Sequence, residues 1–195
     1  MEVIVRDRNG TNLVPIESIH LSQRRIFING DIDDRMASEF FKQVTKLYEE
    51  DKEKSIDVLI NSNGGDVNQG MLMYDVIQGC PCPIRLFCIG KAYSMAAVLF
   101  ASGNHGRYML PHSELMLHEP LLGNRVSGNS SSIKSISDSL LDSKKMLNEI
   151  LSKHTGKSIK EVDQATSYDH YFNPKESISF GLCDKIVGFE KIVER

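Results

Sequence analysis

The sequence predicts an α/β fold whose strands are mostly parallel. Two observations predict it. Short β-rich apolar runs alternate with helical patterns in the order strand, helix, strand, helix, strand, helix, and several of the runs end at glycine-containing turns. The chain has 195 residues, enough to bury a sizeable core, and no long polar linker divides it. We therefore expect one domain over residues 1–195.

The first two thirds of the chain supply this alternation. Residues 24–30 (RRIFING) predict a strand that ends at an Asn-Gly turn. Residues 33–50 predict a helix, since one stripe of it carries Met36, Phe40, Phe41, Val44 and Leu47. Further strands are expected at residues 55–62, 83–90, 107–110 and 114–118, and further helices at 70–79 and 95–103.

The last third is mostly helical. Residues 121–132 (LLGNRVSGNSSS) are rich in Gly, Ser and Asn and predict a mobile loop. A long amphipathic helix follows and ends at Gly156, and residues 158–161 (SIKE) form a capping box that opens another helix. Asn173-Pro174 begins a short helix that ends near Gly181, and residues 184–187 (DKIV) predict a closing strand.

Charge and hydropathy exclude several classes of protein. The net charge of -3 argues against a nucleic-acid-binding protein, which usually shows a basic face. The longest apolar runs, such as residues 95–101, are too short to span a membrane. The N-terminus, MEVIVRDRNG, carries charges where a signal peptide needs an apolar core. We therefore expect a cytoplasmic protein without nucleic-acid or membrane partners.

The sequence lacks the complete motifs of phosphate-binding and metal-binding sites. Gly90-Lys91 is followed by Ala92, where a phosphate-binding P-loop needs Ser or Thr. His118 lacks the second His of a zinc-protease helix, because Leu122 occupies that position. The four cysteines lack C-x-x-C spacing and are expected to be reduced and structural. No metal or cofactor is therefore expected.

Ser94, in AYSMA at residues 92–96, allows two interpretations. Serine is a favoured helix N-cap, because its hydroxyl accepts a bond from an unpaired backbone N–H. A serine at a strand-to-helix turn is also how α/β hydrolases present a nucleophile. The G-x-S-x-G pattern of that turn is not met, since Ala92 and Ala96 replace the glycines. From this window alone the cap is favoured.

Acyl transfer would also need a base, an orienting carboxylate and donors for the oxyanion. Gly64-Gly65 follows a strand and is either a tight turn or a backbone donor that can approach a ligand closely. His118 lies at the end of an apolar strand, where a structural role is more common, and Asp169 has the local pattern of a turn residue. Residue patterns therefore lead to a serine hydrolase hypothesis and leave these alternatives open.

Three longer stretches resemble one family. INSNGGDVNQGMLMYDVI at residues 60–77 resembles the proteolytic subunit of Clp protease (ClpP), whose members carry INSPGG followed by a helix with a Tyr-Asp pair. Residues 90–123 resemble the family's nucleophile helix and His-Gln-Pro strand end, and residues 147–186 its C-terminal third. The resemblance runs from about Arg25 to Val187, with the three motifs in the family's order.

The resemblance implies a catalytic site. It makes Ser94 the nucleophile, His118 the general base and Asp169 the carboxylate that orients the imidazole. It makes the backbone N–H groups of Gly65 and Met95 the oxyanion hole.

The resemblance also implies a fold and an assembly. The fold is a ClpP/crotonase-like spiral of β-β-α units with a protruding handle, a loop plus a long helix, at about residues 121–155. The activity is serine endopeptidase cleavage of unfolded proteins inside a chamber of one or two seven-membered rings. An extended peptide would pair beside Gly65 and the strand after His118. A Clp-type unfoldase ATPase is the candidate partner.

The sequence also departs from the family. Residues 1–24 are divergent and lack the segment that normally forms the axial gate. Two tyrosines of the ATPase-docking pocket are replaced by Asp57 and Leu59. Ser167-Tyr168 replaces an acidic-Arg pair that couples the rings, and Glu119 replaces the usual Gln. A phage-type prohead maturation protease of the same superfamily and a non-catalytic ring subunit are the alternatives.

One further departure lies beside the proposed nucleophile. Tyr93 stands where the family commonly has a small residue, and its ring would either narrow the substrate cleft or pack away from it.

Overall fold

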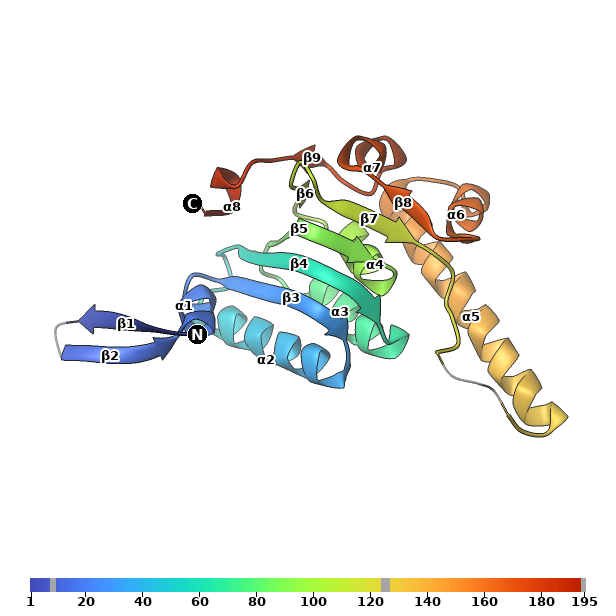
Figure 1. Cartoon of the computed structure of the whole chain (residues 1–195), viewed down its shortest axis with the longest axis horizontal. Helices are drawn as coiled ribbons and strands as arrows, with labels where there is room; N and C mark the ends of the chain where they lie inside the picture. Colours follow the sequence, from blue (N-terminus) through green and yellow to red (C-terminus); the bar gives the residue numbers. More distant parts are fainter. Residues whose placement is uncertain (8–9, 124–126, 194–195) are drawn as a thin grey trace.

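A computed structural model describes all residues except 8–9, 124–126 and 194–195 (Figure 1). The strands are β1 (Glu2–Asp7), β2 (Gly10–Pro15), β3 (Arg25–Ile32), β4 (Ile56–Gly65), β5 (Ile84–Tyr93), β6 (Arg107–Met109), β7 (Glu114–Leu117), β8 (His170–Phe172) and β9 (Lys185–Ile186). The helices are α1 (Ile16–Ser22), α2 (Asp34–Glu50), α3 (Val67–Gly79), α4 (Met95–Ala101), α5 (Ser130–Thr155), α6 (Ile159–Thr166), α7 (Pro174–Phe180) and α8 (Glu190–Val193).

The main sheet is almost entirely parallel, which confirms the predicted fold class. Its strands follow the order β3-β4-β5-β6-β9, and all of these neighbours are parallel. β7 also pairs in parallel with β5, beyond the end of β6, while β8 pairs antiparallel with β7. The first half of α5 extends away from the body, as the predicted handle helix does (Figure 1).

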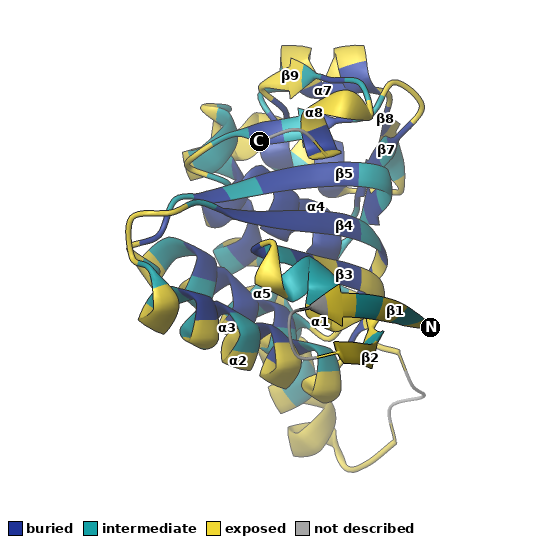
Figure 2. Cartoon of the chain, turned by 90° about the vertical axis from the view of Figure 1, so that its left-hand side faces the viewer, coloured by how far each residue is buried: buried dark blue, intermediate teal, exposed yellow. Residues whose placement is uncertain are grey.

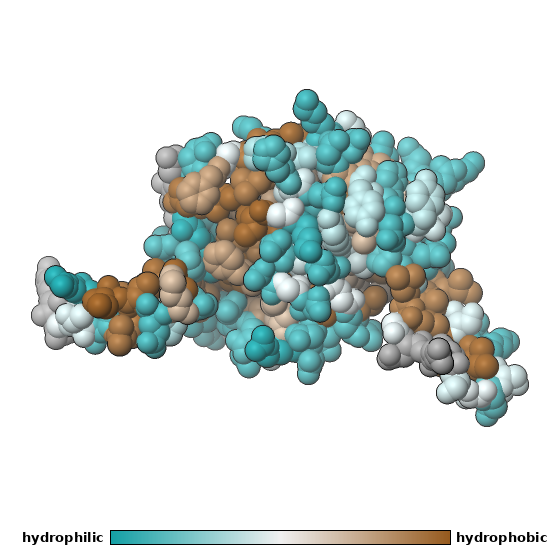
Figure 3. Space-filling view, viewed as in Figure 1, coloured by the Kyte–Doolittle hydropathy of each residue, from teal (hydrophilic) through white to brown (hydrophobic). Residues whose placement is uncertain are grey.

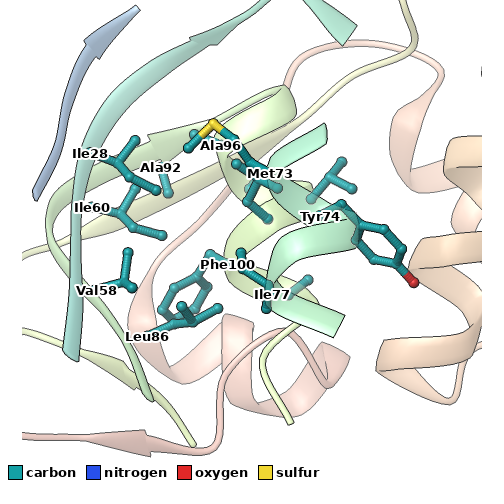
Figure 4. Close-up of a cluster of buried hydrophobic side chains, with 14 of the residues drawn as sticks. Ile28, Val58, Ile60, Met73, Tyr74, Ile77, Leu86, Ala92, Ala96 and Phe100 are labelled. Carbon is teal, nitrogen blue, oxygen red and sulfur yellow. The ribbon is translucent and has the colours of Figure 1, made fainter. Parts of the chain in front are cut away.

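The core lies between one face of this sheet and the helices α2, α3 and α4. Strand residues such as Ile60 and Leu86 face Met73, Ile77 and Phe100 of α3 and α4 (Figure 4). All seven residues of α4 are buried, so this short helix is apolar all round (Figure 2). Burial of each large apolar side chain contributes about 1.5–3 kcal/mol. The strand ends that carry the candidate site are therefore attached to the best-packed part of the molecule.

Local capping signals were predicted correctly. Ser158 and Glu161 form the expected capping box at the start of α6. Asn173 caps α7, with Pro174 at its first position. Gly156 ends α5 in the left-handed conformation, as glycine does readily because it has no Cβ.

Several boundaries differ from the predictions. β5 continues past Gly90 to Tyr93, because its last residues pair with β7. α3 begins at Val67, three residues earlier than predicted, because the Asp66 carboxylate caps it. Phe41, expected on the buried stripe of α2, is 52% exposed. It lies in an open groove of about 550 Å3 between α2 and α3.

The predicted loop is shorter than expected at its C-terminal end. α5 begins at Ser130, so residues 130–132 of the predicted loop are helical. Residues 124–126 of the same prediction lie outside the described residues.

The divergent N-terminal segment forms an antiparallel hairpin, β1–β2, which we did not predict. It projects from the body beside α1 (Figure 1). Ile4 and Leu13 lie opposite each other and are 65% and 66% exposed. Apolar side chains are therefore exposed on this projection (Figure 3). A two-stranded hairpin alone is marginally stable in water.

Arg107, the first residue of β6, connects the C-terminal ends of three helices. Its guanidinium donates to the carbonyls of Ala101 (3.1 Å), His154 (3.2 Å) and Gly181 (2.7 Å), which lie at the C-terminal ends of α4, α5 and α7. It also pairs with Asp184 at 2.6 Å. A cation is favourable at helix C-termini, where carbonyl groups lack intrahelical donors.

We predict that Arg107→Met lowers the free energy of unfolding by about 2–4 kcal/mol, because it leaves three carbonyls and a carboxylate without their cation. Urea unfolding followed by circular dichroism measures the change. Lys42→Met, at an exposed position of α2, is the control and should change the free energy by less than about 0.5 kcal/mol. Equal effects of the two substitutions would contradict the role given to Arg107.

Candidate active site

Ser94 lies at a sharp turn between β5 and α4. Its backbone has φ +53° and ψ −125°, and it is one of only two non-glycine residues with positive φ in the described part of the chain. Such a conformation costs about 1–3 kcal/mol and is common where a turn presents a functional side chain. Ser94 occupies the N-cap position, but its hydroxyl makes no capping bond. Its side chain is therefore not used to cap the helix, contrary to the interpretation favoured by the local sequence.

Hydrogen bonds hold this turn from both sides. The Ser94 N–H donates to the Met116 carbonyl of β7 at 2.8 Å. The Ser94 carbonyl accepts from Ala97 at 2.9 Å and Val98 at 3.2 Å, which starts α4. The amide of Met95 is in the first turn of α4, where backbone N–H groups have no intrahelical acceptor.

Gly64 and Gly65 form the end of β4, against the Ser94 turn. Gly64 has φ +94°, and a Cβ there would lie 2.6 Å from the Tyr93 carbonyl oxygen and 2.8 Å from the Ser94 Cβ. Gly65 has φ +153°, and a Cβ there would lie 2.3 Å from the Ile32 carbonyl oxygen. Both positions therefore require glycine, and the Gly64 backbone lies directly beside the serine turn.

His118 follows the last residue of β7. Its side chain is only 14% exposed, and its buried Nδ1 has no hydrogen-bond partner among the described residues. The nearest carboxylate oxygen is Asp169 Oδ1 at 3.6 Å, longer than a hydrogen bond. Hydrogen bonds of this kind are often long in unliganded sites and shorten when substrate binds.

The antiparallel pairing of β7 with β8 brings His118 and Asp169 together. Leu117 of β7 lies opposite His170 of β8. Because the strands are antiparallel, the residue after Leu117 faces the residue before His170, so His118 lies next to Asp169. The two residues are far apart in the sequence, and only this register places them side by side.

Ser94 and His118 line the same small cavity. Its volume is about 20 Å3, room for about one water molecule. Met95 and Leu117 contribute to its walls, and so do two buried polar residues that sequence reasoning missed, Asn148 of α5 and Thr166 of α6. The Thr166 hydroxyl and the Asn148 amide oxygen are 3.3 Å apart. No local pattern marks either residue, because their neighbours in the site come from distant parts of the chain.

The Tyr93 ring has its own partners. Its hydroxyl donates to the carboxylate of Glu114, and its ring contacts the edge of Tyr171 at a centroid distance of 5.7 Å. The ammonium of Lys91 lies 5.5 Å from the ring centroid. These contacts, rather than the residues of the Ser94 cavity, fix the ring. Of the two alternatives, they favour a ring that packs away from the nucleophile.

The described residues form neither a metal site nor a membrane-spanning helix. No group of three His, Cys, Asp or Glu side chains in this part of the chain is arranged to hold a metal ion. No helix within it has both the length and the apolar character needed to cross a bilayer.

Comparison with known families identifies this chain's family. The model of the family described as Clp protease matches residues 8–190, nearly the whole chain. The match covers every residue discussed in this site.

We predict a pH-dependent contribution of Tyr93 to stability. The hydrogen bond to Glu114, followed by burial, raises the pKa of the Tyr93 phenol to about 12. A folded pKa above the ordinary value of about 10 means that the contribution is complete below about pH 10 and is lost as the pH rises toward 12. Urea unfolding of wild type and Tyr93→Phe should therefore differ at pH 8 and converge above about pH 10.

The control for this measurement is Tyr168→Phe, at a tyrosine that is 68% exposed. The free energy of unfolding of this variant should differ from that of wild type by the same amount at pH 8 and above about pH 10. A difference between wild type and Tyr93→Phe that stays constant to about pH 11 would contradict the assignment.

Proposed function

The chain belongs to the Clp protease family, and we propose that it is a serine endopeptidase with Ser94 as nucleophile, His118 as general base and Asp169 as the carboxylate that orients the imidazole. One observation carries the proposal. Ser94 projects from a turn of positive φ into an enclosed cavity that it shares with His118, and its hydroxyl caps no helix. A strained strand-to-helix turn of this kind is how α/β hydrolases expose a nucleophilic oxygen.

The reaction follows from these positions. His118 accepts the Ser94 hydroxyl proton as the oxygen attacks the peptide carbonyl, and the same proton then passes to the leaving amine. Water attacks the acyl-enzyme, gives its proton to His118, and the proton returns to Ser94 as the acid product leaves. Asp169 keeps the His118 Nδ1 proton in place and stabilises the imidazolium.

The backbone N–H groups of Gly65 and Met95 are the proposed oxyanion hole. Two observations support this role. Gly64 lies against the Ser94 turn and is followed by Gly65 at the exposed end of β4, and the Met95 amide begins α4. Preorganised donors of this type contribute about 2.7–4 kcal/mol each to transition-state stabilisation.

Substrate would bind as an added strand between Gly65 and the segment that follows His118. Gly65 is exposed, and Leu121 and Leu122 of that segment are 69% and 49% exposed. The end of β4 pairs with β3, but after Ser62 no described strand pairs with it on its β5 side, and this free edge together with the exposed segment suits an unfolded peptide. We propose peptides and unfolded proteins as the substrate class.

We further propose that the chain acts as a homo-oligomer of one or two seven-membered rings, the assembly that its resemblance to the ClpP family implies. Exposed apolar residues lie on both projections from the body, Ile4 and Leu13 on the hairpin and Ile133 and Leu141 on α5 (Figure 3). Apolar residues gathered on projections are typical of surfaces that contact another chain. Sedimentation measures the assembly.

A Clp-type unfoldase ATPase would meet an altered surface. Asp57 is buried and forms a bidentate pair with Arg85 at 2.6 and 2.7 Å. Leu59 is 5% exposed, in an apolar cluster with Ile192 of α8. Because both tyrosine positions of the implied docking pocket are occupied in this way, we propose that small peptides are cleaved without an ATPase.

We predict that wild type reacts with a fluorophosphonate probe and cleaves fluorogenic peptides, and that Ser94→Ala does neither. Loss of the nucleophile should lower peptide cleavage by at least about 10⁴-fold. Gel fluorescence and a peptidase assay measure the two effects. Ser102→Ala, at a buried serine just beyond α4, is the control and should be labelled at the wild-type rate. Labelling that survives in Ser94→Ala would overturn the assignment, and an inactive wild type would favour a non-catalytic ring subunit.

A second prediction concerns the glycine turn. Gly64→Ala should lower kcat by about 100-fold or more, because the added Cβ meets the Tyr93 carbonyl and the Ser94 Cβ and displaces the nucleophile. Gly79→Ala is the matched control, since a Cβ there meets nothing within 4 Å. Peptide cleavage under saturating substrate measures both. Equal kcat values for the two variants would show that the Gly64 contact does not position Ser94.

A further inference from the structure

Lys144 of α5 lies between two carboxylates near the candidate site. Its ammonium is 2.9 Å from Glu119 Oε2 and 3.0 Å from Asp163 Oδ1. Glu119 directly follows His118, and Asp163 belongs to α6. One side chain therefore connects three segments, the end of β7, the helix α5 and the helix α6. Glu119 first, and then Asp163, raise the pKa of Lys144, so it is fully charged at neutral pH.

Backbone and side-chain bonds complete the connection. The Glu119 N–H donates to the Thr166 carbonyl, the last residue of α6, at 2.7 Å. The Asn148 amide of α5 donates to Asp163 at 3.2 Å and contacts the Thr166 hydroxyl at 3.3 Å. Lys144 and Asn148 are one helical turn apart on α5, so both fall on the same face of that helix.

These bonds flank both partners of the His118–Asp169 pair. Glu119 is next to His118 in the chain, and Thr166 is three residues before Asp169. The β7–β8 pairing brings the imidazole and the carboxylate together, and the position of α6 relative to the end of β7 adjusts the distance between them. That distance is 3.6 Å, and a change of under about 1 Å separates an aligned hydrogen bond from none.

We propose that Lys144 is a positioning residue for the catalytic pair: by binding Glu119 and Asp163 together, it sets the distance between His118 Nδ1 and Asp169. The proposal rests on the proposed function, since it concerns the alignment of that triad. Lys144 does not touch the reacting atoms and acts only through the segments that it joins.

Lysine suits this place because its ammonium is a compact donor that can bond two carboxylates at once. Without it, Glu119 and Asp163 would face each other as two negative charges beside the same helix, and the like charges would push α6 away from the end of β7. Glu119 is also one of the departures from the family pattern, and Lys144 is the partner that it gains in this chain.

The test compares three variants by peptide kinetics. Lys144→Met should lower kcat by about 10-fold and change KM by less than about 2-fold, because the displaced carboxylate affects proton transfer more than binding. Lys144→Arg should recover most of the lost kcat, since a guanidinium can also bond both carboxylates. Lys145→Met is the matched control, at the next and exposed position of α5, and should retain wild-type kcat.

A double-mutant cycle separates positioning from a general structural effect. If Lys144 acts through Asp169, Lys144→Met should cost nothing further in an Asp169→Ala background, where the carboxylate to be positioned is gone. The rate of fluorophosphonate labelling is the readout, because it remains measurable when turnover is slow. Thermal unfolding of each variant checks that all of them are folded.

The outcomes distinguish the two proposals. A wild type that labels at Ser94, together with a Lys144→Met variant of wild-type kcat, would overturn the positioning role alone. Multiplicative losses in the double mutant would do the same, since they would show that Lys144 acts independently of Asp169. A wild type that never labels would refute the proposed function, and the positioning role with it.

Discussion

The strained turn at Ser94 is the constraint on which the rest of the site depends. Its positive φ costs about 1–3 kcal/mol, so the surrounding structure has to enforce it. β5 must run to Tyr93 and pair with β7, so that the Met116 carbonyl can accept the Ser94 N–H. α4 must be fully buried to hold the far side of the turn, and Gly64 must lack a Cβ to leave room for it. The apolar sequence of α4 is thus a requirement of the serine's geometry as well as of the core.

Features determined by near neighbours in the chain could be predicted, and features determined by distant ones could not. The caps at Ser158 and Asn173 are bonds between residues three positions apart, and a local pattern contains both partners. The hairpin β1–β2 was missed although the sequence carries Asn9-Gly10, a typical turn signal, because the apolar residues of its strands lie on both faces and do not alternate with polar ones. The conformation of Ser94 was missed for another reason. A helix cap and a strained turn place the same residue type at the same position, and only the positive φ and the absence of a capping bond, both features of the structure, separate them.

The candidate site shows the same division. Ser94, His118 and Asp169 were named from a family resemblance, but the contact between the last two depends on the antiparallel register of β7 and β8, which no local pattern contains. Lys144, Asn148 and Thr166 were not named at all. Each is an ordinary residue on an amphipathic helix, and its partners belong to other segments. Sequence reasoning therefore identified the groups that would react and missed those that surround and align them.

The two sides of the site are held by interactions of different strength. The core that carries Ser94 is held at its opposite end by buried guanidinium groups that bond helix C-termini: Arg107 at α4, and Arg24 at the Leu47 and Asp51 carbonyls of α2. On the carboxylate side, Val162 and Ala165 anchor α6 in the core. Asp169, however, is 59% exposed, and solvent reaches the ion pairs of Lys144, each of which contributes about 0–1 kcal/mol. A hydrogen bond to a charged group contributes about 1.5–3 kcal/mol, comparable to the sum of those contacts. The position of Ser94 is therefore fixed by the core, whereas the orientation of His118 depends on forces that act on α5 and α6.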